Sequence, residues 1–162
     1  MTSWTRRLLV PAWAAWALFG SAGAARAGDV TAFVTLPSPD VSWSRGFGAA
    51  LTTTFFGVTA LEFEAARVPL DTATGTMTSF TANALAQIPI GALIPYVGVG
   101  FGVYRQSISD LGQTSTVGTF VAGAKLKLGL LVVRGDYRRL NLHGDPLLPM
   151  DSRVTLGAGI SF

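Results

Sequence analysis

Apolar and polar residues alternate along most of the chain after residue 28. The final segment is the clearest example, because its apolar positions lie at every second residue: Val154, Leu156, Ala158, Ile160 and Phe162. Arg153 and Ser161 begin and end the other face of the same segment. Successive side chains of a β-strand point to opposite faces, so this period of two predicts a strand with one apolar face.

The same pattern predicts eight strands, and no segment has a convincing helical period. The strands are expected at residues 30–36, 43–54, 58–68, 76–88, 94–106, 115–128, 130–141 and 153–162. Alternate connections are polar or rich in Pro and Gly, namely 37–42, 69–75, 108–114 and 142–152. The connections between these are tight, at 55–57, 89–93 and 129. Long loops at one rim and short turns at the other are typical of an outer-membrane barrel.

Composition favours a membrane protein of this kind. Hydrophobic residues make up 49% of the chain and charged residues 13%, and the mean hydropathy is +0.45. An ordinary soluble domain has about 25% charged residues. After residue 28, no stretch stays apolar for the roughly 20 residues of a transmembrane helix. Only helices and closed barrels satisfy the backbone in lipid, so we expect an all-β fold, an eight-stranded antiparallel transmembrane β-barrel.

The first residues have the pattern of a cleavable signal peptide. Arg6 and Arg7 precede an apolar run at 8–20, and Ala25-Arg26-Ala27 is a small-residue cleavage site. We therefore expect a signal peptide at 1–27 and an outer-membrane β-barrel domain at 28–162. A retained membrane anchor is the less favoured alternative, since Pro11 interrupts a short apolar run.

The alternation also predicts which side chains face the lumen. If Leu61, Phe63 and Leu126 face lipid, the charged residues between such positions point inward. This inward set is Glu62, Glu64, Lys125, Lys127, Arg134, Asp136 and Arg138. Buried charges are costly unless they are paired, so we expect a salt-bridge network that largely closes the lumen. The inward glycines at 98, 100 and 102 are expected to leave room for large side chains on the opposite wall.

A soluble barrel such as a lipocalin is the alternative fold. It would reverse the two faces and place the apolar side chains around an internal ligand. The terminal Phe162, the glycine-lined face and the asymmetry of the connections remain unexplained by it, so the transmembrane barrel is favoured.

Removal of the signal peptide changes the charge balance. Without Arg6, Arg7 and Arg26, nine basic residues remain against nine acidic ones. A nucleic-acid partner is not expected, because binding would require clustered surplus basic charge. The chain has no cysteine, which excludes disulfides, thiolate nucleophiles and cysteine metal ligands.

Three stretches carry a resemblance to a known family. They are IPYVGVGFGVYR at 94–105, AGAKLKLGLLVVRGDYRRL at 122–140, and the terminal VTLGAGISF. The chain resembles the outer-membrane-protein β-barrel domain family, whose small members are similar to the transmembrane domain of outer-membrane protein A. The resemblance implies fold and a Gram-negative outer-membrane location more than function. Phe162, with the apolar residues at every second position behind it, resembles the signal read by the barrel assembly machinery.

Catalytic residues are few. Two lipid A-modifying enzymes of this fold size use a rim histidine with a serine. His143 is the only histidine. A deacylase of this kind would have a serine two residues after the histidine, but this position is Asp145 here. The nearest serine downstream is Ser152. Glu62 and Glu64 share a face about 7 Å apart, which fits an acid/base pair, but the inward bases favour a structural network. We therefore expect no enzyme, no cofactor and no metal site.

The predicted function is a small outer-membrane barrel with a structural or surface-contact role and a lumen largely closed by charges. A narrow porin-like channel and a lipid A-modifying enzyme are the alternatives. The expected partners are outer-membrane lipid and lipopolysaccharide, with the barrel assembly machinery during biogenesis. We expect a monomer.

Overall fold

The chain forms a closed barrel of eight antiparallel strands in which each strand pairs with its sequence neighbours and β1 pairs with β8. A computed structural model describes residues 27–162 except 39–42, 71–74, 109–110, 145 and 149. Of the predicted signal peptide at 1–27, residues 1–26 lie outside the described residues. Among the residues that are described, no helix is long and apolar enough to cross a membrane.

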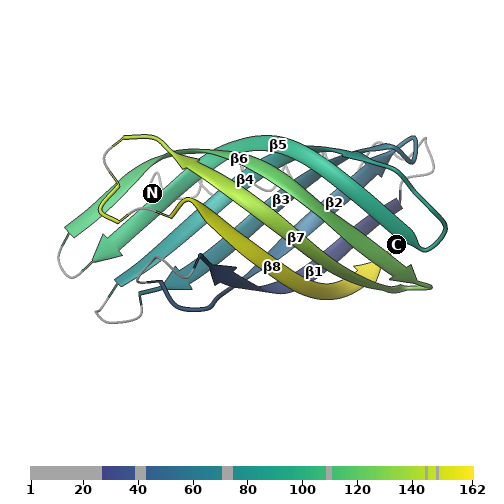
Figure 1. Ribbon diagram of the computed structural model, residues 1–162, viewed down its shortest axis with the longest axis horizontal. Helices are drawn as coiled ribbons and strands as arrows, with labels where there is room; N and C mark the ends of the chain where they lie inside the picture. Colours follow the sequence, from purple (N-terminus) through teal and green to yellow (C-terminus); the bar gives the residue numbers. More distant parts are fainter. Residues whose placement is uncertain (1–26, 39–42, 71–74, 109–110, 145, 149) are drawn as a thin grey trace, which may run out of the picture.

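All eight predicted strands are present, which confirms the expected all-β barrel of eight antiparallel strands. They are β1 (Ala27–Pro37), β2 (Gly46–Phe55), β3 (Thr59–Pro69), β4 (Gly75–Gln87), β5 (Leu93–Ile108), β6 (Leu111–Leu128), β7 (Leu131–Leu142) and β8 (Ser152–Ser161). The strands run obliquely to the long axis of the barrel (Figure 1), as closure of a sheet requires.

The connections β2–β3, β4–β5 and β6–β7 lie at one end of the barrel, which we call the turn end. Each contains a glycine with positive φ: Gly57 at 75°, Gly91 at 63° and Gly129 at 66°. Glycine adopts this conformation without steric cost, so it permits the sharp reversal that joins neighbouring strands. The start of β1 and the end of β8 lie at the same end (Figure 1).

The other connections define the loop end, and two details there differ from the prediction. The expected loop at 108–114 is mostly paired strand, because the ladder continues to Ile108 opposite Leu111. Polar residues there resemble a loop in sequence, but hydrogen bonds between strands do not depend on an apolar face. Trp43 does not begin β2; it forms an isolated bridge with Leu70.

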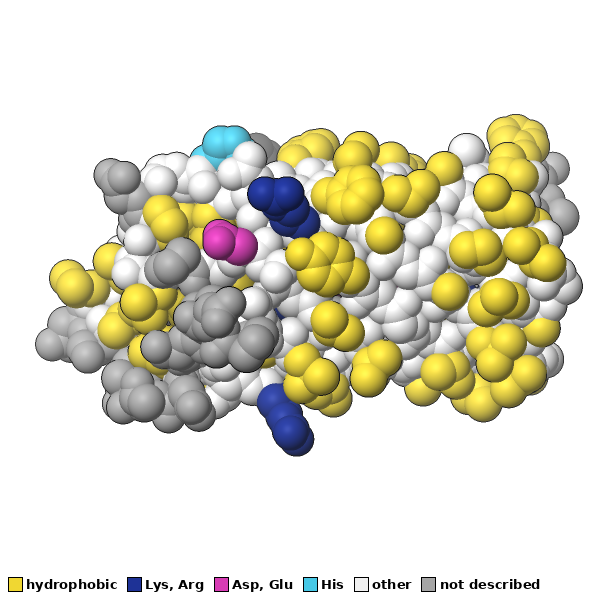
Figure 2. Space-filling model, viewed as in Figure 1, with side chains coloured by type: hydrophobic (Ala, Val, Ile, Leu, Met, Phe, Trp, Pro, Cys, Tyr) yellow, Lys and Arg dark blue, Asp and Glu magenta, His cyan; other side chains and the backbone are white. Residues whose placement is uncertain are grey.

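The two faces of the wall differ sharply. On β3, Leu61 and Phe63 are exposed on the outside, whereas Glu62 and Glu64 are buried inside. Hydrophobic side chains cover a broad band of the outer surface (Figure 2). The soluble-barrel alternative requires the opposite arrangement and is therefore wrong for this structure.

The inward glycines of β5 lie very close to the neighbouring strand β4. A Cβ placed on Gly102 would lie inside contact distance of the carbonyl oxygen of Phe80, on the adjacent strand β4. The same holds for Gly100 and the carbonyl oxygen of Ala82. These glycines therefore permit a close approach of neighbouring strands, and Gly100 also leaves room for the side chain of Asn83.

Candidate functional site

Among the described residues, eight charged side chains are buried in the lumen, and we call them the ionic layer. They comprise four carboxylates and four cations, and each residue is at most 4% exposed: Asp29, Glu62, Glu64, Asp136, Lys125, Arg134, Arg138 and Arg153. Alternation places them inside because each occupies the inward parity of its strand. The layer is formally neutral.

Two arginines of β7 form the centre of the ionic layer. Arg134 donates from Nη1 to Oε2 of Glu62 at 2.5 Å and from Nη2 to Oδ2 of Asp136 at 2.7 Å. Arg138 donates from Nη2 to Oε1 of Glu62 at 2.8 Å and from Nε to Oδ1 of Asp136 at 2.7 Å. Each guanidinium therefore joins two carboxylates, which compensates its loss of water.

Glu64 extends this centre toward the loop end. Its Oε2 lies 2.8 Å from Nη1 of Arg138, although these two atoms are not aligned for a hydrogen bond. Its other oxygen, Oε1, accepts a hydrogen bond from Arg153 of β8. The Glu64–Arg138 contact is thus an electrostatic one, whereas Glu64–Arg153 is also a hydrogen bond.

A separate ion pair involves Lys125 of β6. Its Nζ lies 2.9 Å from Oδ2 of Asp29 and donates to Oγ1 of Thr52 at 3.1 Å. The ring of Tyr96 lies between the two groups of charges: Nζ of Lys125 is 5.7 Å from its centroid and Cζ of Arg134 is 5.6 Å away. Tyr96 also donates its hydroxyl to Asp136 at 2.8 Å, so it connects the pair to the centre.

Neutral side chains complete the layer. Asn83 of β4 donates to Glu62 at 3.3 Å and accepts from Thr119 at 2.5 Å. Thr155 of β8 donates to Asp136 at 2.5 Å. With Thr52 on β2 and Tyr96 on β5, every strand contributes at least one group to the layer.

The structure brings together all but one of the seven lumenal charges named from the sequence. The exception is Lys127, which is only partly buried and makes no ion pair among the described residues. Two members of the layer, Asp29 and Arg153, are absent from the predicted set. Asp29 precedes the predicted start of the first strand, so extending each strand by one or two residues would have found it. Arg153 occupies an inward position in the alternation, and that position is the signal that could have found it.

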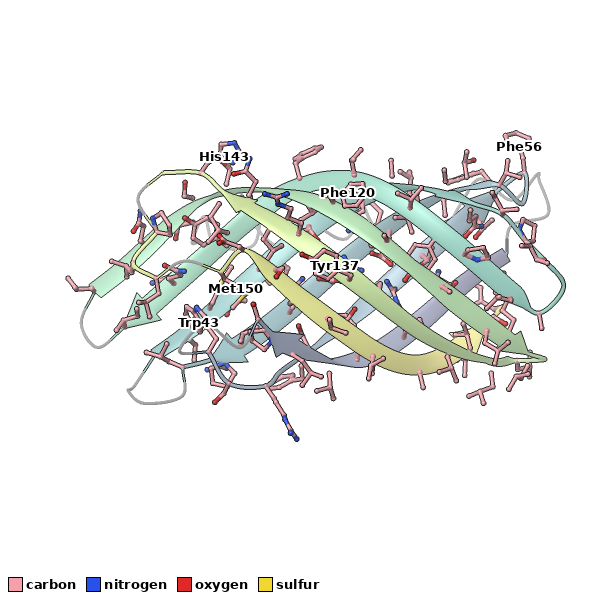
Figure 3. The ribbon with its side chains drawn as sticks, viewed as in Figure 1. Trp43, Phe56, Phe120, Tyr137, His143 and Met150 are labelled. Carbon is pink, nitrogen blue, oxygen red and sulfur yellow. The ribbon has the colours of Figure 1, made fainter. Side chains whose placement is uncertain are left out.

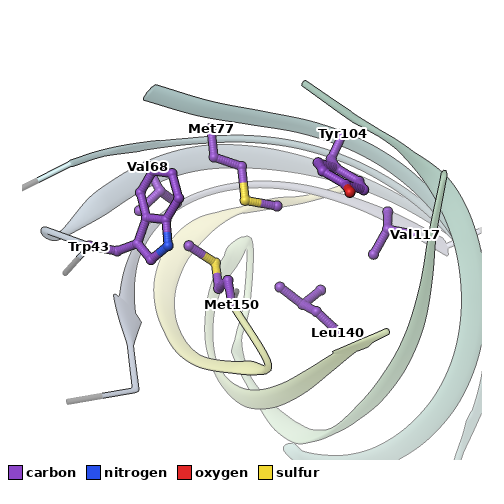
Figure 4. Close-up of a cluster of buried hydrophobic side chains, with 7 residues drawn as sticks. All are labelled: Trp43, Val68, Met77, Tyr104, Val117, Leu140 and Met150. Carbon is purple, nitrogen blue, oxygen red and sulfur yellow. The ribbon is translucent and has the colours of Figure 1, made fainter. Parts of the chain in front are cut away.

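An apolar cluster, which we call the apolar cap, fills the lumen at the loop end. Its buried members come from five strands and two connections: Trp43, Val68, Met77, Tyr104, Val117, Leu140 and Met150. Figure 4 shows the Met150 side chain next to the Trp43 ring within this cluster. Both residues belong to connections, at β1–β2 and β7–β8, so the loops supply part of the closure.

Two hydrogen-bonded contacts hold the β7–β8 connection against the wall. The fully buried Gln106 donates from Nε2 to the Leu148 carbonyl at 2.7 Å, and its Oε1 accepts from the Leu148 amide at 3.2 Å. Tyr104 donates its hydroxyl to the His143 carbonyl at 3.0 Å. A side-chain amide that satisfies both backbone groups of one residue positions the whole connection.

His143 lies at the outside of the loop end (Figure 3). Its side chain is exposed, and among the described residues no serine or carboxylate forms a hydrogen bond with the imidazole. Asp145, the acidic neighbour noted in the sequence, lies outside the described residues. In the part of the chain that is described, no group of three His, Asp or Glu side chains is arranged to hold a metal ion.

The apolar face of β8 points outward, and the last residue closes the barrel. Phe162 exchanges two backbone hydrogen bonds with Gly28, at 2.8 and 2.9 Å. The outward residues before it are Ile160, Ala158, Leu156 and Val154. The terminal strand is therefore one side of the seam at which β1 and β8 meet.

Comparisons with known proteins identify similar folds. No family model matches the chain, and no curated protein matches it in sequence. Among solved structures, Neisserial surface protein A has a TM-score of 0.59 at 17% identity, covering 84% of this chain and 94% of that one. The N-terminal β-barrel domain of Pseudomonas aeruginosa OprF has a TM-score of 0.55 at 20% identity, covering 84% and 97%.

A further match is the Pseudomonas aeruginosa outer membrane protein OprG, with a TM-score of 0.53 at 14% identity, covering 85% of this chain and 95% of that chain. At these identities the likeness concerns the fold. The resemblance inferred from the sequence motifs is confirmed at that level: this chain has the fold of the small eight-stranded outer-membrane barrels.

Proposed function

We propose that this protein is an outer-membrane barrel with a closed lumen, which acts through its outer surface and loop end rather than by conducting solutes. The observation that carries the proposal is the double closure of the interior, by the ionic layer and the apolar cap. An eight-stranded barrel has an interior only wide enough for side chains. Here charged side chains occupy its middle and hydrophobic ones its loop end.

A narrow channel is the alternative, and the packing argues against it. An ion entering the ionic layer would meet carboxylates and guanidinium groups that already neutralise one another at 2.5–2.8 Å. It would also have to cross the apolar cap without hydration. Both steps are costly, because the carboxylates of the ionic layer already form ion pairs with buried cations, and the apolar cap consists of hydrophobic side chains.

The outer surface supports the proposed location. The band of exposed apolar side chains suits a lipid environment, with the turn end in the periplasm and the loop end outside. The signal peptide at 1–27, recognition of Phe162 by the assembly machinery, contact with lipopolysaccharide and a monomeric state belong to the same proposal. A lipid A-modifying activity is the weaker alternative, because the His143 imidazole has no activating hydrogen bond among the described residues.

Bilayer recording tests the proposal directly. The protein is purified from outer membranes, checked for heat-modifiable migration on gels, and inserted into planar bilayers. We expect no steady conductance from the folded wild-type barrel. A reproducible open state of the folded protein would support the channel instead, and recovery of the protein from the soluble periplasm would remove the membrane assignment.

A further inference from the structure

Two arginines lie in one row across the outer face of β3, β4 and β5. Arg67 is opposite Thr78, and Thr78 is opposite Arg105. Residues directly opposite one another on neighbouring strands have Cα atoms about 5 Å apart, so the two arginine Cα atoms lie about 10 Å apart. Two guanidinium groups at this spacing can reach a single phosphate between them.

Both arginines are exposed, and neither forms an ion pair with a carboxylate among the described residues. The guanidinium of Arg105 leans toward the loop end, since a Cβ placed on Gly112 would lie 3.8 Å from its Nη2. Gly112 is opposite Ser107, two positions nearer the loop end than Arg105. This is the direction in which a cationic side chain at the border of an apolar band extends its charge.

An apolar hollow lies directly on the turn-end side of this row. The next two outward rows in register are Ala65–Phe80–Val103 and Phe63–Ala82–Phe101. These six residues, together with residues of β1, β2 and β6, line an open hollow of about 670 Å³. The alanines leave the space, and the three phenylalanines form its walls. Cationic groups above an apolar hollow match a lipid with an anionic headgroup.

An outward arginine of β7 has different surroundings. Arg139 lines a notch together with Asp151, Asn141 and Phe120, so a carboxylate shares its surroundings. Figure 2 shows Lys and Arg side chains at the loop-end border of the apolar band, on the face turned to the viewer. Basic side chains thus border the apolar band on more than one face of the barrel. On the face formed by β3–β5, they lie beside an apolar hollow.

We propose that this surface, which we call the Arg67–Arg105 surface, binds a phosphorylated glycolipid of the outer leaflet. The phosphate is held between the two guanidinium groups, and an acyl chain lies in the hollow beside Ala65 and Ala82. Guanidinium pairs form strong, charge-assisted contacts with phosphate. The inference rests on the proposed function, since only the proposed orientation places the loop end in the glycolipid leaflet.

Native mass spectrometry of the folded barrel in detergent tests the inference. The probes are lipid A, dephosphorylated lipid A and phosphatidylglycerol, each added to the full protein. Two variants each remove one part of the surface. R67Q/R105Q removes the two positive charges, and A82W fills the hollow. The matched controls are R139Q, an outward arginine of β7, and A86W, an outward alanine nearer the turn end of β4. Heat-modifiable migration establishes that each variant is folded.

We expect the wild type and both controls to retain lipid A. R67Q/R105Q should weaken retention about tenfold or more, given the contribution of each basic residue near an anionic lipid. A82W should reduce it without a change of charge, and dephosphorylated lipid A should bind the wild type weakly. Equal loss in R139Q, or equal retention of phosphatidylglycerol and lipid A, would overturn the inference.

Asp71 and Asp110 follow these strands in the sequence and lie outside the described residues. The variant D71N/D110N should therefore also be measured: unchanged or tighter lipid A binding supports the assignment, whereas a loss equal to that of R67Q/R105Q overturns it. Failure of the inference leaves a silent, heat-modifiable outer-membrane barrel intact. Failure of the proposed function shows itself separately, as conductance or as a soluble location.

Discussion

Arg134 and Glu62 join opposite walls of the barrel: Nη1 of the arginine lies 2.5 Å from Oε2 of the glutamate. Their strands, β7 and β3, are four strands apart around the closed sheet in either direction. The ion pair therefore spans the interior, and Arg138 makes a second such contact with Glu62 at 2.8 Å. One glutamate of β3 thus forms ion pairs with two arginines of the far wall.

Removal of Glu62 should destabilise the barrel strongly. Glu62→Ala leaves Arg134 and Arg138 each without one buried carboxylate, and loss of one partner of a buried pair costs about 3–5 kcal/mol. The measurement is the free energy of unfolding in urea, from a folded barrel in detergent or vesicles. Glu62→Gln is the companion variant, because it keeps the volume and removes only the charge.

A double-mutant cycle with Arg134→Ala isolates the interaction itself. We expect the double variant to recover part of the loss, with a coupling energy of about 0.5–3 kcal/mol. Strict additivity would show that the two side chains do not interact in the folded barrel.

Lys125 and Lys127 form a matched pair on the same inward parity of β6. Lys125 is 1% exposed and paired with Asp29, whereas Lys127 is partly buried and makes no ion pair among the described residues. Lys125→Leu should therefore cost about 3–5 kcal/mol, and Lys127→Leu should change stability by no more than about 0.5 kcal/mol. Equal effects in urea unfolding would contradict the placement of the network.

Leu126, between these two lysines, tests the outward face. It is 39% exposed and lies two residues from the turn end of β6, so an arginine there should cost up to about 1 kcal/mol, less than the roughly 2–4 kcal/mol expected near the bilayer midplane. Leu126→Arg should show this loss in vesicles, with Leu126→Ala as the control for lost side-chain volume. The prediction is refuted if both variants unfold at the same urea concentration in phospholipid vesicles.

The apolar cap and the ionic layer should act as barriers in series. Trp43→Ala/Met150→Ala removes two buried side chains of the cap, and Glu62→Ala/Arg134→Ala thins the layer. We expect neither double variant to conduct in planar bilayers, and we expect their combination to do so. A steady conductance from the cap variant alone would show that the ionic layer does not close the lumen.

Phe162 should be needed for assembly. Its backbone pairs with Gly28 at the seam between β1 and β8, and its side chain is exposed. Deletion of Phe162, or Phe162→Asp, should lower the amount of folded barrel in outer membranes while the protein is still exported. Ile160→Asp tests the next apolar position of the same row. A yield of folded barrel equal to that of the wild type would mean that this end is not read during assembly.

The alternation of side chains is sufficient to predict the strands and their two faces. A strand has a period of exactly two, so one clear apolar row, such as Val154 to Phe162, determines every inward position on that strand. For this reason the alternation alone places Glu62, Asp136 and Arg138 inside the barrel. Strand boundaries are less sharply defined, and Asp29 falls outside the predicted first strand because that strand begins earlier than its apolar pattern indicates.

The sequence by itself determined the number of strands, the outward apolar row and most of the buried charges. The partners of those charges were decided only by the closed barrel, because β3 and β7 meet across the lumen through side chains and not through sequence proximity. The apolar cap had no sequence signal for the same reason: Trp43 and Met150 come from different connections. The row of Arg67 and Arg105 likewise depends on the register of three strands, which a local period does not specify.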